Sequence, residues 1–128
     1  MYSLDILSRT PVYEQIIKQT EDFISKGILN PGDKIPSVRN LSVMLSVNPN
    51  TIQKAFSELD TRGLIFSVPG KGCFITENAH EIVNSSKRKK LVELDSQISE
   101  LMYAGIKKEE IIDLIEKIYK GGKTNDQN

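Results

Sequence analysis

The chain has 128 residues, of which 38% are hydrophobic, and its formal net charge is zero. That length and apolar content allow one compact domain with a helical appendage. The balanced charge excludes a chain-wide positive field, so contact with nucleic acid would depend on a local cluster. No apolar run approaches the roughly 20 residues that span a bilayer, and no signal-peptide pattern is present. With a lone cysteine, Cys73, these features predict a cytoplasmic protein without a disulfide and without membrane contact.

The first expected helix follows Thr10 and Pro11, a capping hydroxyl and a proline suited to the first helical position. Apolar residues then recur at helical spacing as far as Ile24, and Gly27 is expected to end the helix. We interpret this helix as part of the core. The connector that follows, residues 28–35, is expected to add a short strand beside a later hairpin.

Two short helices are expected next, separated by a tight turn at Ser46-Val47. Ser37 is expected to cap the earlier helix, which would direct three apolar residues inward: Leu41, Met44 and Leu45. Asn48 is expected to cap the later helix, with Pro49 in its first position. That later helix carries one apolar stripe at i, i+3, i+4 and i+7, formed by Ile52, Ala55, Phe56 and Leu59.

The opposite face of the later helix is polar and free of acidic residues. It carries Asn50, Gln53, Lys54 and Ser57, with Thr51 near its leading end. Asn and Gln can pair bidentately with adenine in the major groove, and Thr or Ser can reach base edges or phosphates. A solvated helix face is the alternative, but the caps, the polar face and the hairpin that follows together favour a recognition helix.

A glycine-tipped β-hairpin is expected after Gly63, with strands near 64–68 and 73–77 joined by Pro69-Gly70-Lys71-Gly72. Between Lys34 and Thr76 there are five basic and two acidic residues, a local excess of three positive charges. A helix pair followed by such a hairpin is typical of a winged helix-turn-helix. The sequence therefore predicts a mainly α fold with a small β wing, in a sequence-specific DNA-binding protein.

This run resembles the DNA-binding domain of the GntR family of bacterial transcription regulators. The resemblance covers nearly all of residues 11–76, and its pieces include Pro11–Ile16, Pro31–Ser37, Arg39, Asn50-Thr51 and Gly70–Gly72. The stretch from Val47 to Ala55, together with the short C-terminal region, is similar to the YtrA-like subfamily. Three positions depart from the usual family pattern: Val68 for arginine in the wing, Asn40 for glutamate, and Phe56 for tyrosine.

The resemblance implies a set of DNA-contacting residues. It implies a DNA contact for Arg39, base contacts around the start of the later helix, and a minor-groove position for Gly70. Combined with the polar face and the basic residues, the candidate site is Lys34, Ser37, Arg39, Asn48, Asn50, Thr51, Gln53, Lys54, Gly70 and Lys71. It also implies that the partner is double-stranded DNA bearing an inverted repeat, and that the regulated operon is of the transporter type.

A second segment, residues 78–122, predicts two amphipathic helices broken at Gly105 and ending at Gly121-Gly122. Its first helix has a 3-4-3 apolar seam, and its second helix has another apolar face. Two helices cannot bury both faces alone, so they need a partner, either the winged domain or a second copy of the same hairpin. The resemblance to the YtrA-like subfamily implies the second copy, and with it a two-helix dimerisation hairpin. The expected contacts are Leu91, Leu94, Ile98, Leu101, Ile111, Ile115 and Ile118. Residues 1–77 would then form the winged domain, and residues 123–128 a disordered tail.

Other functions remain open on the sequence alone. The run Lys87–Lys90 is interpreted as a solvated helix face, with a phosphate contact as the alternative. His80 has no cysteine or carboxylate cluster at ligand spacing, so we expect no metal. The sequence also lacks a nucleophile–base pair and a phosphate-binding loop, so we expect no catalytic residues and no cofactor. A winged domain can also bind protein, and the neutral charge allows that. The leading hypothesis is a homodimeric repressor, with any small-molecule effector unidentified.

Overall fold

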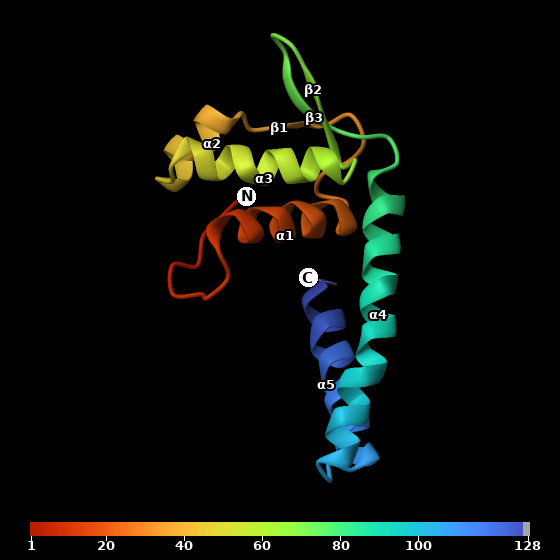
Figure 1. Ribbon diagram of the computed structural model, residues 1–128. Coiled ribbons are helices and arrows are strands. Elements are labelled where there is room, and N and C mark those ends of the chain that lie inside the picture. The colour runs from red at the N-terminus through yellow and green to blue at the C-terminus, as the bar shows by residue number, and fades with distance from the viewer. Residues whose placement is uncertain (127–128) are drawn as a thin grey trace. The chain divides into compact units, whose positions relative to one another are not determined.

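The chain forms two compact units in a computed structural model that describes residues 1–126. The first unit is Met1–Lys87, and the second begins at Arg88. Along the described residues the elements are α1 (Val12–Ser25), β1 (Lys34–Ile35), α2 (Val38–Leu45), α3 (Pro49–Thr61), β2 (Ile65–Val68), β3 (Gly72–Ile75), α4 (Ala79–Tyr103) and α5 (Lys108–Asp126) (Figure 1). This arrangement of helices with one small antiparallel sheet confirms the expected fold class.

Helix α1 forms because its apolar residues recur along one face, which is buried. The buried residues of this face are Ile16, Ile17, Thr20, Glu21 and Ile24. The expected cap by Thr10 is wrong, because Pro11 occupies the capping position and no side chain caps the helix. The helix ends as predicted at Gly27, whose φ of +74° turns the chain so that Ile28 N donates to Phe23 O.

The segment before α1 also packs on the core, which periodicity could not predict. Tyr2 is only 7% exposed, and its hydroxyl is hydrogen-bonded to Thr20 Oγ1 at 2.7 Å. Its ring meets Phe23 edge-on, with the centroids 5.1 Å apart. Burial raises the pKa of the Tyr2 phenol, and the hydrogen bond with Thr20 offsets part of that rise.

Helices α2 and α3 are capped as the sequence predicts. Ser37 Oγ accepts from Asn40 N at 3.0 Å, and Asn48 Oδ1 accepts from Asn50 N at 2.8 Å. The turn between the helices places Ser46 in the left-handed region, with φ +54°. The prediction that Met44 points into the core is wrong, because Met44 is 60% exposed. The inward stripe of α2 instead follows helical spacing through Val38, Leu41, Ser42 and Leu45, leaving Met44 on the outer side.

The sheet has the order β1-β3-β2, with both pairs antiparallel. The expected short strand in the connector is therefore present, as β1. Register pairs Lys34 with Phe74 and Phe74 with Phe66, so these side chains share one face of the sheet. The other face buries Ile35, Ile65 and Ile75 in the core. Figure 1 shows the β2–β3 hairpin extending away from the helices as a wing.

The first unit extends beyond the expected boundary at residue 77. Ala79 and Val83, in the first turns of α4, are fully buried and join the core of the winged unit. Ile82 also packs there, with its Cδ1 at 3.3 Å from where a Cβ on Gly63 would lie. The compact unit therefore ends at Lys87, because the first two turns of α4 complete its core.

The second unit contains the rest of α4 and all of α5. The two helices are joined by a turn at Gly105, with φ +90°, as predicted. The expected helix end at Gly121-Gly122 is wrong, because α5 continues through both glycines to Asp126. A helical glycine costs about 1 kcal/mol relative to alanine and is not an obligatory stop. Most of the expected disordered tail, residues 123–126, is thus helical backbone, and residues 127–128 lie outside the described range.

Candidate nucleic-acid interface

The polar face of α3 is exposed where the sequence predicts it. Ile52, Ala55, Phe56 and Leu59 are buried in the core, so the other side of the helix faces outward. That side presents Asn50, Gln53, Lys54 and Ser57 as exposed residues, with Thr51 half-buried. Gln53 Nε2 donates to Ser57 Oγ at 3.3 Å, so its amide lies along the helix. The result is a short row of hydrogen-bonding groups of the kind that contacts base edges.

The two predicted capping residues of the site have structural roles as well. The side-chain oxygens of Ser37 and Asn48 accept backbone N–H groups at the starts of α2 and α3. Those oxygens are therefore engaged, whereas the Ser37 hydroxyl hydrogen and the Asn48 amide hydrogens remain as donors. Both residues fix the helix starts, and through them the direction of the first turns of α2 and α3.

The basic residues of the first unit fall into two groups. Among the described residues, Arg39 on α2 and Lys71 at the wing tip make no ion pair, and both are exposed. Arg62, which contributed to the local positive excess, is engaged instead: its Nε lies 2.9 Å from Glu58 and its Nη1 3.4 Å from the buried carboxylate of Glu21. The available positive charge therefore lies away from the C-terminal end of α3.

The wing is built around glycines that allow close approach. Lys71 N donates to Val68 O at 2.9 Å, closing the turn, and Gly70 has φ +76°. Gly72 has φ +116°, and a Cβ there would lie 2.9 Å from Lys34 Cε. The Lys34 stem therefore lies across Gly72, which brings its ammonium to the wing at Gly72, the residue after Lys71. The short strand itself was expected, but the contact of its Lys34 side chain with Gly72 was not predicted.

Lys54 has a partner that the sequence did not predict. Its Nζ lies 3.9 Å from the centroid of the Tyr13 ring on α1. Tyr13 is half-buried and packs on the core, as its place in the α1 pattern suggested. Gln53 and Lys54 are thus neighbours in sequence, but their side chains take different directions from α3.

Other chemistry is not supported by the described residues. Within residues 1–126 no group of three metal-ligating side chains comes together, and His80 is half-buried at the start of α4. Across the same range no helix is both long and apolar enough to cross a membrane. Lys87 is half-buried, and the three basic residues after it are exposed.

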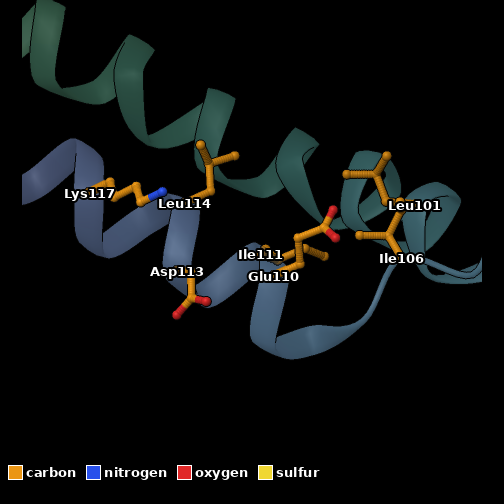
Figure 2. A pocket seen from close by; sticks show the side chains of 7 residues that line it. All are labelled: Leu101, Ile106, Glu110, Ile111, Asp113, Leu114 and Lys117. Atoms are coloured by element: carbon orange, nitrogen blue, oxygen red, sulfur yellow. The ribbon is translucent and has the colours of Figure 1, made fainter.

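The second unit exposes the apolar residues that were expected to dimerise. Leu91, Leu94, Ile98 and Leu101 are 36–62% exposed, and Ile115 and Ile118 on α5 are 43% and 59% exposed. Ile111 is half-buried. Between the end of α4 and α5 lies an open cavity of about 400 Å³ (Figure 2), lined by Leu101, Ile106, Glu110, Ile111, Asp113, Leu114 and Lys117.

Comparison with known proteins decides the family. The family model described as bacterial regulatory proteins, gntR family, matches residues 12–75, which run from the start of α1 to the end of β3. The chain belongs to the GntR family. The HTH-type transcriptional repressor YtrA of Bacillus subtilis is 42% identical over 130 residues, covering 98% of this chain and all of the relative. The likeness to YtrA-like GntR regulators is therefore confirmed.

Solved GntR structures extend the likeness to three dimensions. A GntR family transcriptional regulator from Listeria monocytogenes matches 89% of this chain and 98% of its own, with TM-score 0.72 at 38% identity. AraR(DBD) in complex with operator ORX1 matches 59% of this chain and 96% of its own, with TM-score 0.53 at 32% identity. The chain is a DNA-binding transcriptional regulator, and the expectation that it is not an enzyme is confirmed by its family.

Proposed function

We propose that this GntR regulator is a homodimeric repressor that binds an inverted-repeat operator through α3 and the wing. The observation that carries the proposal is the exposed, acid-free face formed by Asn50, Gln53 and Lys54 on a helix whose other side is locked into the core. A rigid helix with amide side chains at its leading end suits insertion into the major groove. The 42% identity to a repressor of similar length supports repression over activation.

Different residues of the interface would take different parts in binding. Asn50, Thr51 and Gln53 would contact bases, with Asn48 and Ser37 at the helix starts donating to bases or phosphates. Arg39, unpaired on α2, would contact the DNA beside α3. The wing would contact the DNA backbone or the minor groove through Lys34, Gly70 and Lys71. Its glycines carry no side chain, so the wing can approach DNA closely there.

The second unit would hold two copies together. Its apolar residues are exposed as a contiguous set, which usually marks a surface that a partner covers. Each of the larger ones would contribute about 1.5–3 kcal/mol to association if it became buried. Pairing through Leu91, Leu94, Ile98, Leu101, Ile111, Ile115 and Ile118 would bring two α3 helices into one dimer, one for each half-site of an inverted repeat. The domain assignment that follows is a winged unit for DNA and a helical unit for assembly.

We propose a transporter-type operon as the regulated target, because the resemblance to the YtrA-like subfamily implies one. Measuring transcripts in a deletion strain tests this: genes of a transporter operon should rise in the deletion strain if the protein represses them. A fall in those transcripts would indicate activation, and no change in any transporter operon would reject this target.

The base contacts are tested with an operator selected by the full-length protein from random duplexes. Asn50→Ala or Gln53→Ala should each weaken specific binding by about 1–3 kcal/mol without lowering the melting temperature. Thr61→Ala, at the far end of α3, is the matched control and should bind as the parent does. Parent-like binding by both Asn50→Ala and Gln53→Ala would refute the base-contact assignment. Salt-insensitive binding of a protein ligand would instead favour an interaction module.

A further inference from the structure

The contact between Lys54 and Tyr13 links the DNA-facing side of α3 to α1. The Lys54 ammonium lies 3.9 Å from the centroid of the Tyr13 ring, well within the range of a cation–π interaction. The Lys54 side chain remains exposed, so the ring holds the ammonium on the surface without burying it. A lysine on a solvated helix would otherwise move among many rotamers.

The Tyr13 ring is itself held in place by the core. It is half-buried on α1, between the end of the N-terminal segment and the buried residues Ile16 and Ile17. Its hydroxyl donates to Glu14 Oε1 at 3.3 Å. Because α1 and α3 pack together in one core, the ring has a fixed position relative to α3 (Figure 1). The Tyr13 ring can therefore restrict the Lys54 ammonium to one position relative to α3.

We infer that Tyr13 is a positioning residue that fixes Lys54 as a phosphate contact on the α1 side of the recognition helix. The inference rests on the proposed DNA interface and assigns Lys54 a role different from that of its neighbour Gln53. Gln53 lies along α3 toward Ser57, whereas Lys54 leans toward the Tyr13 ring on α1. In the proposed complex Gln53 would contact base edges, and Lys54, which points away from Gln53, would contact the DNA backbone beside them. A lysine held as a point charge suits a phosphate, and such a contact carries no sequence information.

Because a phosphate contact is independent of sequence, a random 30-base-pair duplex is a sufficient probe. Binding of the full-length chain is measured by fluorescence anisotropy over a salt series. The variants are Tyr13→Phe, Tyr13→Leu, Lys54→Ala and the double variant Tyr13→Leu with Lys54→Ala. Phenylalanine keeps the aromatic face, so Tyr13→Phe is the matched control and should bind as the parent does.

Lys54→Ala should reduce the slope of log K against log salt by about 0.9, the value for one lost phosphate contact. Tyr13→Leu should keep the slope, since the charge remains, but weaken binding by about threefold to tenfold, the range expected when one long side chain loses its preorganisation. In the Lys54→Ala background, Tyr13→Leu should have no further effect. Both variants should leave the ratio of operator to random affinity unchanged.

Three results would overturn the inference. Equal weakening by Tyr13→Leu in both backgrounds would make Tyr13 a general structural residue. Tighter binding by Tyr13→Leu would mean that the ring withholds Lys54 from DNA, and a shift in the operator-to-random ratio would make Lys54 a base contact. If Tyr13→Leu lowers the melting temperature, Tyr13→Met, which is flexible and apolar, supplies the same comparison. Salt-independent binding by the parent would reject the whole DNA interface, whereas the other results reject only this role of Tyr13.

Discussion

The two units of this chain use apolar side chains in opposite ways. In the winged unit the core residues, from Tyr2 to Val83, are at most 7% exposed. In the helical unit Leu91 is 62% exposed, and even the best covered residue of the α4 seam, Ile98, is 36% exposed. The members of both sets that lie on helices follow helical spacing in the sequence. Periodicity therefore identifies an apolar face, but the partner that covers it must come from elsewhere.

The difference separates stability from assembly. The winged unit closes its core within one chain, using three helices, a small sheet and the first turns of α4. The helical unit leaves both faces open, which a soluble protein rarely does unless a partner covers them. Variants in the winged unit should change folding or DNA contact, and variants in the seam should change subunit pairing.

The largest expected effect comes from a charge placed in the seam. Ile98→Asp would put an unpaired carboxylate where a second copy should pack, so the protein should become monomeric. Operator affinity should then fall by about 10²- to 10⁴-fold, the typical gain from linking two binding modules. Gln97→Asp, one residue away and off the seam, is the control. Sedimentation and operator titration measure both effects, and a dimeric Ile98→Asp would place the interface elsewhere.

The second largest expected effect is the loss of stability when a core side chain of the winged unit is truncated, compared with a truncation in the helical unit. Leu59→Ala, at a fully buried position of α3, should lower the free energy of unfolding by about 2–5 kcal/mol. Leu91→Ala, at an exposed position, should change it by less than about 0.5 kcal/mol. Denaturant unfolding of both variants is best measured in the monomeric Ile98→Asp background, so that association does not contribute. Equal losses would contradict the division into a closed and an open unit.

Arg39 and Arg62 give a smaller and more specific comparison within the winged unit. Arg39→Ala should weaken operator binding, because its guanidinium is exposed and unpaired. A fall of about 0.9 in the salt slope would identify a phosphate contact, and an unchanged slope with relaxed sequence preference would identify a base contact. Arg62→Ala should leave both unchanged, since Arg62 is paired with Glu21 and Glu58. An Arg39→Ala protein with parental affinity would remove Arg39 from the interface.

The smallest effect concerns alkaline pH. Burial raises the pKa of Tyr2 above its ordinary value of 10.0, so the folded state binds the phenolic proton more tightly than the unfolded state. The contribution of Tyr2 to stability is therefore complete below pH 10.0 and declines as the pH rises from there through the folded pKa. Tyr2→Phe should lose about 1 kcal/mol at neutral pH with the Thr20 hydrogen bond, and less above pH 10.0. Denaturant unfolding of the parent and the variant measures this difference in the free energy of unfolding, which is about 1 kcal/mol at neutral pH. A difference that stays constant from about pH 8 to about pH 11 would contradict this prediction.

Local signals explain which parts of the fold could be predicted. The caps at Ser37 and Asn48, the helix ends at Gly27 and Gly63, and the wing turn each depend on a few adjacent residues. Long-range packing could not be inferred in this way. Tyr2 lies 18 residues from its hydrogen-bond partner along the chain. The first turns of α4, beyond the expected domain boundary, are part of the core.

For the interface, the sequence predicted residue types and their face, but not their partners. The exposed positions of Asn50 and Gln53 followed from the period of α3. Three contacts that were not predicted join different elements: the ion pair of Arg62 with Glu21, the cation–π contact of Lys54 with Tyr13, and the packing of Lys34 against Gly72. Such contacts depend on how the elements pack, so a count of charges along the chain overstated the positive charge available to DNA.

The central claim is that two winged units, joined through their helical units, occupy one operator. Sedimentation velocity of the full-length protein mixed with its selected operator tests this directly. The expected result is a complex containing two 14.4 kDa chains per duplex, with no stable complex of one chain at comparable affinity. A complex of one chain per duplex that forms with the full operator affinity would contradict the account.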